Sequence, residues 1–312
     1  MAVKIKDIAK DKELLAGGHR ACAACAAPPV LRMVMHVAGP DTVIGFATGC
    51  MEVSTTIYPY TAWRVPYIHC AFENVAATVS GAEAAYQAAL KKGTIDKKVN
   101  FIAFGGDGGT YDIGLQSLSG AMERGHNMLY VCYDNEAYMN TGIQRSGSTP
   151  LGAHTNTSPA GSVIPGKTQQ KKDLTGIMAA HRIPYVAQAS VHNFRDLLAK
   201  VEKALAKEGP AFMNILAPCH RGWRFKPEEA IEIAEMATNT CFWPLFEVED
   251  GEWKLNYKPK EKIPMPDYLF KQGRFAHLKK DENKHIVDEI QAETDKRWEE
   301  TLAKTGGEVT KV

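Results

Sequence analysis

The fold is decided by Val99-Asn100-Phe101-Ile102-Ala103-Phe104-Gly105-Gly106-Asp107-Gly108-Gly109. The part up to Phe104 is an apolar run typical of a buried strand, and a glycine-rich turn follows it. A helical pattern then covers Asp112–Arg124, and a second apolar run, Met128–Tyr133, ends in Asp134-Asn135. This order of strand, glycine turn, helix and strand predicts a βαβ unit.

The predicted unit has the chemistry of a phosphate and metal site. Glycines at the carboxyl end of a strand let a ligand approach the backbone closely, and the N-terminal end of the next helix favours a phosphate. Asp107 lies in the turn and Asn135 ends the neighbouring strand, so both can face one crevice. Two oxygen ligands, together with substrate phosphates and water, suit Mg²⁺. The alternative is a plain α/β turn with an exposed aspartate, but the pairing with Asn135 favours a functional site.

Length and composition exclude several classes of protein. The 312 residues suit one large domain or two, and 45% apolar residues suffice for a sizeable core. The net charge of +1 gives no reason to expect binding to nucleic acid or to a membrane. No run of 18 apolar residues is present, and the N-terminus lacks the apolar core of a signal peptide. We therefore expect a cytoplasmic protein.

Patterns on both sides of the central unit predict more of an α/β fold. Further strands are expected at Thr42–Ala47, Pro184–Ala189 and Ala211–Leu216, with a small hairpin at Phe242–Val248 and Glu252–Tyr257. Further helices are expected from Pro28 and at Phe72–Lys92, Asp173–His181, Asn193–Lys207, Pro227–Met236 and Lys284–Ala303, with a short helix or arm at 1–16. We predict loops at Glu52–Ile68 and Met139–Lys172. The second loop begins beside Asn135, which favours an active-site loop over a surface hairpin or a subunit arm.

The sequence predicts two parts of different character. Residues 1–240 form an α/β domain with a doubly wound, mostly parallel sheet. Residues 241–312 contain more lysine and proline, and their last helix is amphipathic. We interpret them as a C-terminal extension that contacts a partner subunit, and a solvated appendage of the domain is the alternative.

Four of the seven cysteines form a candidate metal site. Cys22 and Cys25 are a CxxC pair, and Cys50 and Cys219 each end a strand pattern. In a parallel sheet such ends share one edge, so four thiolates can converge there. They suit a [4Fe–4S] cluster or a structural zinc ion, and the lack of a second close pair favours iron–sulfur. Cys132 lies in a buried strand pattern, where a cysteine serves as a small apolar side chain.

The central unit resembles a known cofactor signature. Gly106-Asp107-Gly108, followed 27 residues after Gly108 by Asn135, is similar to the thiamine diphosphate motif. The resemblance implies that Asp107 and Asn135 bind Mg²⁺ on the cofactor's diphosphate, with the backbone carbonyl of Ala137 as the third ligand. It also implies a sheet of the thiamine diphosphate-binding type.

Nearly the whole chain resembles the β subunit of 2-oxoacid:ferredoxin oxidoreductases, closest to the pyruvate synthase type. The stretches that carry the resemblance are Thr48–Thr55, Tyr58–Trp63, Phe72–Thr78 and Phe104–Pro150. The resemblance implies that Cys22, Cys25, Cys50 and Cys219 hold a [4Fe–4S] cluster and that Asn140 lies near the thiazolium as the catalytic residue of this chain. The further cofactor contacts that it implies are Gly49, Gly106, Gly108, Gly109 and Thr141.

One departure from the family pattern concerns the substrate. The family reads C-x-G-C-G at the first cysteine pair, whereas this chain reads Cys22-Ala23-Ala24-Cys25-Ala26. The cluster ligands are kept, but two added methyl groups change the wall between cluster and cofactor. This leaves room for a relative that oxidises oxalate without coenzyme A.

The resemblance implies oxidative decarboxylation of a 2-oxoacid, pyruvate by default, with electrons passing through the cluster to ferredoxin. Other subunits of the alpha, gamma and delta type, ferredoxin and, for pyruvate, coenzyme A are the expected partners. The carboxylate that activates the cofactor's aminopyrimidine is expected on a partner subunit. Glu52, Glu73, His19 and His220 lie near the expected site, and we interpret them as supporting residues rather than catalytic ones.

Two other functions compete with this interpretation. A non-redox thiamine diphosphate-dependent decarboxylase or carboligase needs no converging cysteines. A non-enzymatic zinc-binding assembly subunit has no need of the pair Asp107 and Asn135.

Overall fold

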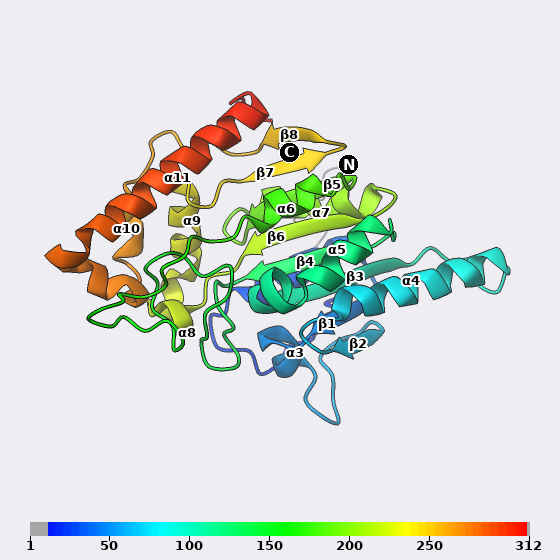
Figure 1. Cartoon of the computed structure of the whole chain (residues 1–312). Coiled ribbons are helices and arrows are strands. Elements are labelled where there is room, and N and C mark those ends of the chain that lie inside the picture. Colours follow the sequence, from blue (N-terminus) through cyan, green and yellow to red (C-terminus); the bar gives the residue numbers. More distant parts are fainter. Residues whose placement is uncertain (1–11, 311–312) are drawn as a thin grey trace.

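An eight-stranded sheet runs through the molecule with helices on both faces (Figure 1). The computed structural model describes residues 12–310. The strand order is β2-β1-β3-β4-β6-β5-β7-β8, and the first six strands are parallel while β7 and β8 are antiparallel. The fold is therefore the mostly parallel α/β fold that the sequence predicted.

The strands are β1 (Thr42–Ala47), β2 (Tyr67–Cys70), β3 (Asn100–Gly106), β4 (Leu129–Asp134), β5 (Tyr185–Ser190), β6 (Ala211–Leu216), β7 (Phe246–Glu249) and β8 (Glu252–Leu255). The α-helices are α2 (Ala27–Ala38), α3 (Cys50–Thr55), α4 (Val75–Lys91), α5 (Leu115–Glu123), α6 (Leu174–Ala180), α7 (Phe194–Ala206), α8 (His220–Trp223), α9 (Ala230–Asn239), α10 (Met265–Leu269) and α11 (Lys284–Thr305). The other helical turns are η1 (Gly108–Ile113), η2 (Pro227–Glu229), η3 (Gly273–Lys279) and η4 (Asp281–Asn283).

The central βαβ unit is confirmed. Strands β3 and β4 pair in parallel, with Gly106 opposite Tyr133, so the residues that follow both strands meet at one edge of the sheet. The helical segment between them begins earlier than predicted, because the π-helical η1 starts at Gly108. The turn after β3 therefore passes directly into a helix, with Asp107 at the junction.

The prediction of a loop over Glu52–Ile68 is wrong at both ends. Helix α3 covers Cys50–Thr55, and the Thr55 hydroxyl donates to the Met51 carbonyl at 2.6 Å in its last turn. Strand β2 has only four residues and pairs with one neighbour, β1. Such short elements carry too little periodicity for the sequence to reveal them. Most of the short helix or arm expected at 1–16 lies outside the described residues.

The predicted hairpin is confirmed, but it is not a separate unit. Strands β7 and β8 pair with Phe246 opposite Leu255, and β7 also pairs with β5 at the edge of the main sheet. The segment beyond residue 241 thus continues the sheet of the α/β domain. The division at residue 240 and the role of the second part in subunit contact stay predictions.

Three clusters of buried apolar side chains hold the layers together. Two lie on the opposite faces of the sheet. The third joins the end of β6 and the loop around Leu151 to the C-terminal helices, including Trp223, Phe275 and Ile290. Helix α11, coloured red in Figure 1, therefore packs its apolar side on this chain.

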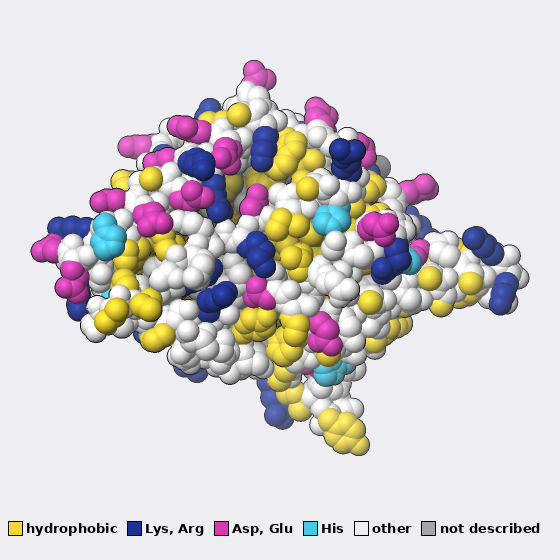
Figure 2. Space-filling view, viewed as in Figure 1, with side chains coloured by type: hydrophobic (Ala, Val, Ile, Leu, Met, Phe, Trp, Pro, Cys, Tyr) yellow, Lys and Arg dark blue, Asp and Glu magenta, His cyan; other side chains and the backbone are white. Residues whose placement is uncertain are grey.

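The surface in Figure 2 shows positive and negative side chains interspersed rather than gathered by sign. This agrees with the net charge of +1. Among residues 12–310, no helix combines the length and apolar character that crossing a lipid bilayer requires.

Candidate cofactor site

The candidate site lies at the carboxyl ends of the central parallel strands. Asp107 follows β3, Asn135 follows β4, and Gly49 comes two residues after β1. Asp107 is fully buried and Asn135 is 6% exposed. The structure thus brings together at one edge the groups that the sequence placed there, as expected for a parallel sheet.

Three oxygen atoms converge in this turn. The Asn135 side-chain oxygen lies 3.0 Å from Asp107 Oδ1 and 2.9 Å from the Ala137 carbonyl oxygen. Rotating the amide would replace that oxygen by a nitrogen that donates to both groups, which is the stable arrangement without a cation. With a cation the oxygen orientation is favoured, because octahedral Mg²⁺ ligands at 2.0–2.1 Å lie about 2.9 Å from one another. The donor set therefore fits Mg²⁺.

The Asp107 carboxylate is held in place from two sides. Its Oδ1 accepts from the Asn135 backbone N–H at 3.2 Å, and its Oδ2 accepts from the Ser146 hydroxyl at 2.5 Å. Burial, and next the neighbouring Asp134 carboxylate, raise the pKa of Asp107 well above its usual value. A buried carboxylate in this environment is stabilised in its charged form by a nearby cation. Ser146 comes from the predicted active-site loop, so that loop reaches the turn.

A small cleft of about 20 Å³ opens beside these oxygens. Its walls include every cofactor contact that the family resemblance implied except Asp107: Gly49, Gly106, Gly108, Gly109, Asn135, Ala137, Asn140 and Thr141. Cys50 and Tyr133 line it too. The cleft has room for about one water, so this chain alone does not enclose a cofactor of the size of thiamine diphosphate.

Two glycines keep the cleft open. A Cβ atom on Gly49 would lie 2.8 Å from the Tyr133 hydroxyl, and one on Gly108 would lie 2.5 Å from Cε1 of Tyr138. The Tyr133 hydroxyl is buried and makes no hydrogen bond, and burial, followed by the Cys50 thiolate, raises the pKa of Tyr133 well above its usual value. A ligand that binds in this cleft finds glycine backbone on one side and an unpaired hydroxyl on another.

Charged residues that sequence reasoning missed lie behind the turn. Lys171 Nζ bonds to Asp134 at 3.1 Å and to Glu136 at 2.9 Å, and Arg274 bonds to Glu136 at 2.6 Å. Burial alone raises the pKa of Glu136, but Lys171 and Arg274 outweigh it and lower that pKa. Asp134 adjoins Asn135 in the sequence, whereas Arg274 comes 138 residues after Glu136 and no local pattern signals it.

The four predicted cluster cysteines gather at the same edge of the sheet. All four are free thiols, with Cys22 exposed and the other three partly buried. Burial, together with negative charge on Cys219 and on Cys22, raises the pKa of Cys25 to about 12, against a hydrogen bond from the Ala27 backbone that lowers it. The pKa of Cys50 is raised by burial and by the other three thiolates. Thiols that influence one another in this way lie close together.

These thiols do not form a site for a single ion. Among residues 12–310, no group of three or more His, Cys, Asp or Glu side chains is arranged to hold one metal ion. A zinc ion draws its sulfur ligands to about 2.3 Å. The preference for a cluster over zinc stays a prediction from the sequence.

The four supporting candidates lie in different surroundings. Glu52 is buried, and its carboxylate accepts from the Thr56 hydroxyl at 2.8 Å. Glu73 is exposed just before α4. His19 Nδ1 accepts from the Ala21 backbone at 3.4 Å, and burial lowers the pKa of His220. The Glu73 carbonyl lies near the end of η1, where it would be 3.3 Å from a Cβ on Gly114.

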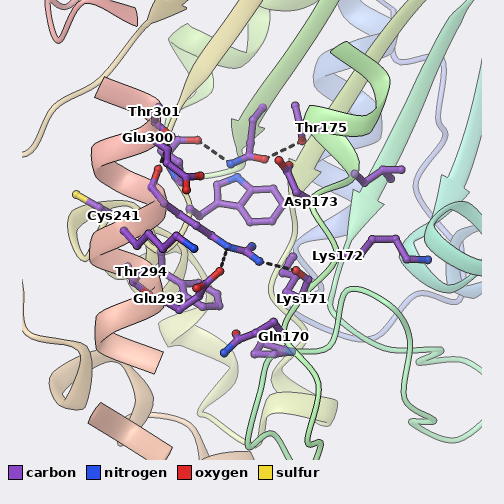
Figure 3. Close-up of a pocket in the computed structure, with 18 of the residues that line it drawn as sticks. Gln170, Lys171, Lys172, Asp173, Thr175, Cys241, Glu293, Thr294, Glu300 and Thr301 are labelled. Carbon is purple, nitrogen blue, oxygen red and sulfur yellow. Dashed lines mark hydrogen bonds and ion pairs between the residues drawn. The ribbon is translucent and has the colours of Figure 1, made fainter. Parts of the chain in front are cut away.

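A larger cavity, of 270 Å³, lies elsewhere, between α11 and the residues that precede β7 (Figure 3). Its walls combine the Trp243 and Trp253 rings with charged groups such as Lys171, Lys172 and Glu293. It contains neither the glycine turn nor the four cysteines of the candidate cluster, although Cys241 lines it. Volume alone does not make it the candidate site, since the convergent oxygens and thiols lie at the other cleft.

Comparisons with known proteins agree with this site. The family described as thiamine pyrophosphate enzyme, C-terminal TPP binding domain, matches residues 47–215, which include the glycine turn and Asn135. The chain is 54% identical to pyruvate synthase subunit PorB of Thermotoga maritima, over 100% of this chain and 98% of that protein. It is 58% identical to pyruvate synthase subunit PorB of Methanocaldococcus jannaschii, over 86% and 90% of the two chains.

A solved structure shows the same fold. The 2-oxoglutarate:ferredoxin oxidoreductase from Magnetococcus marinus matches with a TM-score of 0.55 and 20% identity, over 75% of this chain and 80% of that one. At this identity the match supports the fold alone, and the family assignment rests on the sequence relatives. The chain belongs to the PorB family of β subunits of 2-oxoacid:ferredoxin oxidoreductases, and it contains the thiamine pyrophosphate-binding domain of that enzyme class.

Proposed function

We propose that this chain is the β subunit of a pyruvate synthase that oxidatively decarboxylates pyruvate and passes electrons through a [4Fe–4S] cluster to ferredoxin. The observation that carries the proposal is the meeting of two donor sets at one sheet edge. One is the oxygen triad of Asp107, Asn135 and Ala137, and the other is the set of four cysteine thiols. Cys50 also lines the cofactor cleft, so the two sets adjoin.

Mg²⁺ and the cofactor's diphosphate would be held by the turn after β3. Asp107, Asn135 and the Ala137 carbonyl would bind the metal, and the backbone of Gly106, Gly108 and Gly109 would approach the phosphates. When bound, thiamine diphosphate supplies the electron sink that allows a 2-oxoacid to lose CO₂. The chain's own residues orient the diphosphate end and exclude water from the turn.

Asn140 and Thr141 form the outer wall of the cleft. We assign to Asn140 a contact with the reacting end of the cofactor, where its amide can donate a hydrogen bond to a substrate oxygen. The cleft is too small to surround a cofactor, which supports a site completed by another subunit. The carboxylate that activates the aminopyrimidine would come from that partner. We assign the assembled enzyme to the cytoplasm.

Cys22, Cys25, Cys50 and Cys219 would hold the cluster, which accepts electrons one at a time. The mutual influence of these thiols on their pKa values supports their proximity, and the lack of a second close cysteine pair in the sequence favours a cluster over zinc. Binding the cluster would require all four thiols to be deprotonated.

Pyruvate is the proposed substrate because relatives at 54% and 58% identity are named pyruvate synthase subunits. Coenzyme A would then accept the acetyl group. Ala24 and Ala26, which replace glycines of the family pattern, keep oxalate as the second candidate. Turnover of oxalate without coenzyme A, and none of pyruvate, would decide for that candidate.

One experiment on the reconstituted multi-subunit enzyme tests both donor sets. Asp107→Ala should abolish Mg²⁺-dependent binding of thiamine diphosphate, measured by isothermal titration calorimetry, because it removes the one charged oxygen of the triad. Asp96→Ala, which removes an exposed carboxylate after α4, is the matched control and should bind normally. Unchanged affinity in Asp107→Ala would refute the metal site.

The second arm uses low-temperature EPR of the reduced enzyme. Cys219→Ser should give a labile or three-iron cluster while thiamine diphosphate still binds, because the oxygen triad is untouched. Cys132→Ser is the control, since Cys132 is fully buried in β4. A normal four-iron signal and full ferredoxin reduction in Cys219→Ser would refute the cluster assignment.

A further inference from the structure

The turn that carries the oxygen triad is bent at Glu136. This residue stands between Asn135 and Ala137, and its φ of +64° lies in the left-handed region that side chains other than glycine rarely adopt. Glu136 is also completely buried. A glutamate stays in such a conformation only where its surroundings hold it, and strained residues of this kind gather at functional sites.

Every polar group of Glu136 has a partner that holds it. Its backbone N–H donates to Asp134 Oδ1 at 3.0 Å, and its carbonyl accepts from the Thr149 hydroxyl at 2.7 Å. Its carboxylate accepts from Lys171 at 2.9 Å through one oxygen and from Arg274 at 2.6 Å through the other. The bend between two members of the triad is thus fixed by four bonds.

Arg274 acts on both halves of the turn. Its guanidinium bonds to Glu136 and lies 3.8 Å above the Trp223 ring. The Trp223 indole N–H in turn donates to the Asn135 carbonyl at 2.7 Å. Arg274 is 2% exposed, and Gln272 fixes its Nε at 2.9 Å. One side chain from η3 therefore supports Asn135 by packing and Glu136 by charge.

The other cation, Lys171, is also fixed from the C-terminal segment. Its backbone carbonyl accepts from Arg297 of α11 at 2.9 Å, and Arg297 bonds to Glu293 at 2.6 Å. Figure 3 shows these two interactions as dashed lines between the labelled Glu293 and Lys171. Residues beyond 241 thus hold both cations that bind Glu136.

We propose that Arg274 and Glu136 are positioning residues for the metal, which makes the C-terminal segment a part of the cofactor site. This inference rests on the proposed magnesium site. Arg274 keeps Glu136 in its bent conformation, and that conformation directs the Ala137 carbonyl toward Asn135 and Asp107. Partners that orient metal ligands in this way commonly change metal affinity 10–100-fold when they are removed.

Simple electrostatics predicts the opposite effect. The buried carboxylates of Asp107, Asp134 and Glu136 face two cations, Lys171 and Arg274. Removing Arg274 makes the surroundings of the metal more negative, which by charge alone strengthens the binding of a divalent cation. Weaker binding in an Arg274 variant therefore reports position rather than charge.

The test is a titration of the assembled enzyme with Mn²⁺ in place of Mg²⁺, at saturating thiamine diphosphate, with free Mn²⁺ measured by EPR. Arg274→Met should raise the half-saturating Mn²⁺ concentration at least 10-fold. Arg274→Lys keeps the positive charge but not the planar guanidinium, so its half-saturating concentration should lie between those of the unaltered enzyme and Arg274→Met. Lys271→Met is the control. Lys271 lies three residues before Arg274 and forms an exposed ion pair with Glu232. The Lys271→Met variant should leave Mn²⁺ affinity unchanged.

Removing one member of a buried ion pair can prevent folding. The double variant Glu136→Gln/Arg274→Met removes both charges and serves where Arg274→Met does not fold; its Mn²⁺ affinity should also fall at least 10-fold. The inference is overturned if a folded variant binds Mn²⁺ as tightly as the unaltered enzyme or more tightly. It is also overturned if the loss of Mn²⁺ affinity across the variants only parallels the fall in their melting temperature without metal. If the unaltered enzyme binds no Mn²⁺, or Asp107→Ala binds it normally, the proposed function fails instead.

Discussion

Gly108→Ala isolates the contribution of the open cleft to cofactor binding. The backbone at Gly108 is helical, so alanine causes no strain in the main chain. The added methyl group, however, would lie 2.5 Å from Cε1 and 2.6 Å from Cγ of Tyr138. The Tyr138 ring must therefore move by about 0.9 Å to restore an ordinary contact of 3.4 Å.

The ring has little space in which to move. It packs edge-on against Phe72, with ring centroids 5.9 Å apart, and its other side faces the cleft of about 20 Å³. A shift into the cleft occupies the space of the ligand. Overpacking of this kind costs about 1–3 kcal/mol, and the same free energy taken from binding lowers thiamine diphosphate affinity by roughly 5–150-fold.

The assay compares calorimetric affinity for thiamine diphosphate with the melting temperature of the ligand-free enzyme. Gly81→Ala is the control, because Gly81 lies in α4 and a methyl group there has no neighbour within 4 Å. It should stabilise the protein by about 1 kcal/mol and leave affinity unchanged. Normal affinity in Gly108→Ala, with an unchanged melting temperature, would refute the steric argument.

Two further predictions concern assembly and acid stability. The isolated chain should show no turnover of pyruvate with an artificial electron acceptor, because its cleft holds only part of a cofactor; robust turnover would contradict this. Burial lowers the pKa of His192 from 6.5 to about 4, so between those pH values the unfolded chain binds a proton that the folded chain does not. Stability should therefore fall as the pH falls through this range, by about 3 kcal/mol from this residue at most. His192→Gln should flatten the dependence in urea unfolding at pH 7, 5 and 4, and an unchanged dependence would exclude this cause.

The sequence was sufficient for the fold and for the members of the site that lie in or beside strong patterns. The apolar runs before Asp107 and Asn135 defined parallel strands, and the topology then required both residues to meet at one edge. Cys50 and Cys219 follow β1 and β6, so the same topology brings them to that edge, whereas the CxxC pair precedes α2. The hairpin was also found, because β7 and β8 are flanked by turn residues.

The residues that support the turn had no such signal. Arg274 lies in a short 3₁₀ segment, and its partner Glu136 lies between the strand end at Asn135 and the predicted loop that begins at Met139. Ser146 and Lys171 lie in that predicted loop, whose conformation depends on contacts with Asp107 and α11 rather than on its own periodicity. Long-range ion pairs follow from the finished fold, so a single sequence does not reveal them.

Helix α8 connects the two proposed centres. Cys219 precedes it and accepts from the Gly222 backbone at 3.5 Å, while Trp223 at its end donates to the Asn135 carbonyl. A Cβ on Gly222 would collide with the end of the Met139 side chain, so a larger residue there would displace Met139. The Trp223 ring is held by the Asn135 carbonyl and by the Arg274 guanidinium above it rather than by the Cys219 thiol. The cluster can therefore be lost without displacing Asn135, which is why Cys219→Ser is expected to separate electron transfer from cofactor binding.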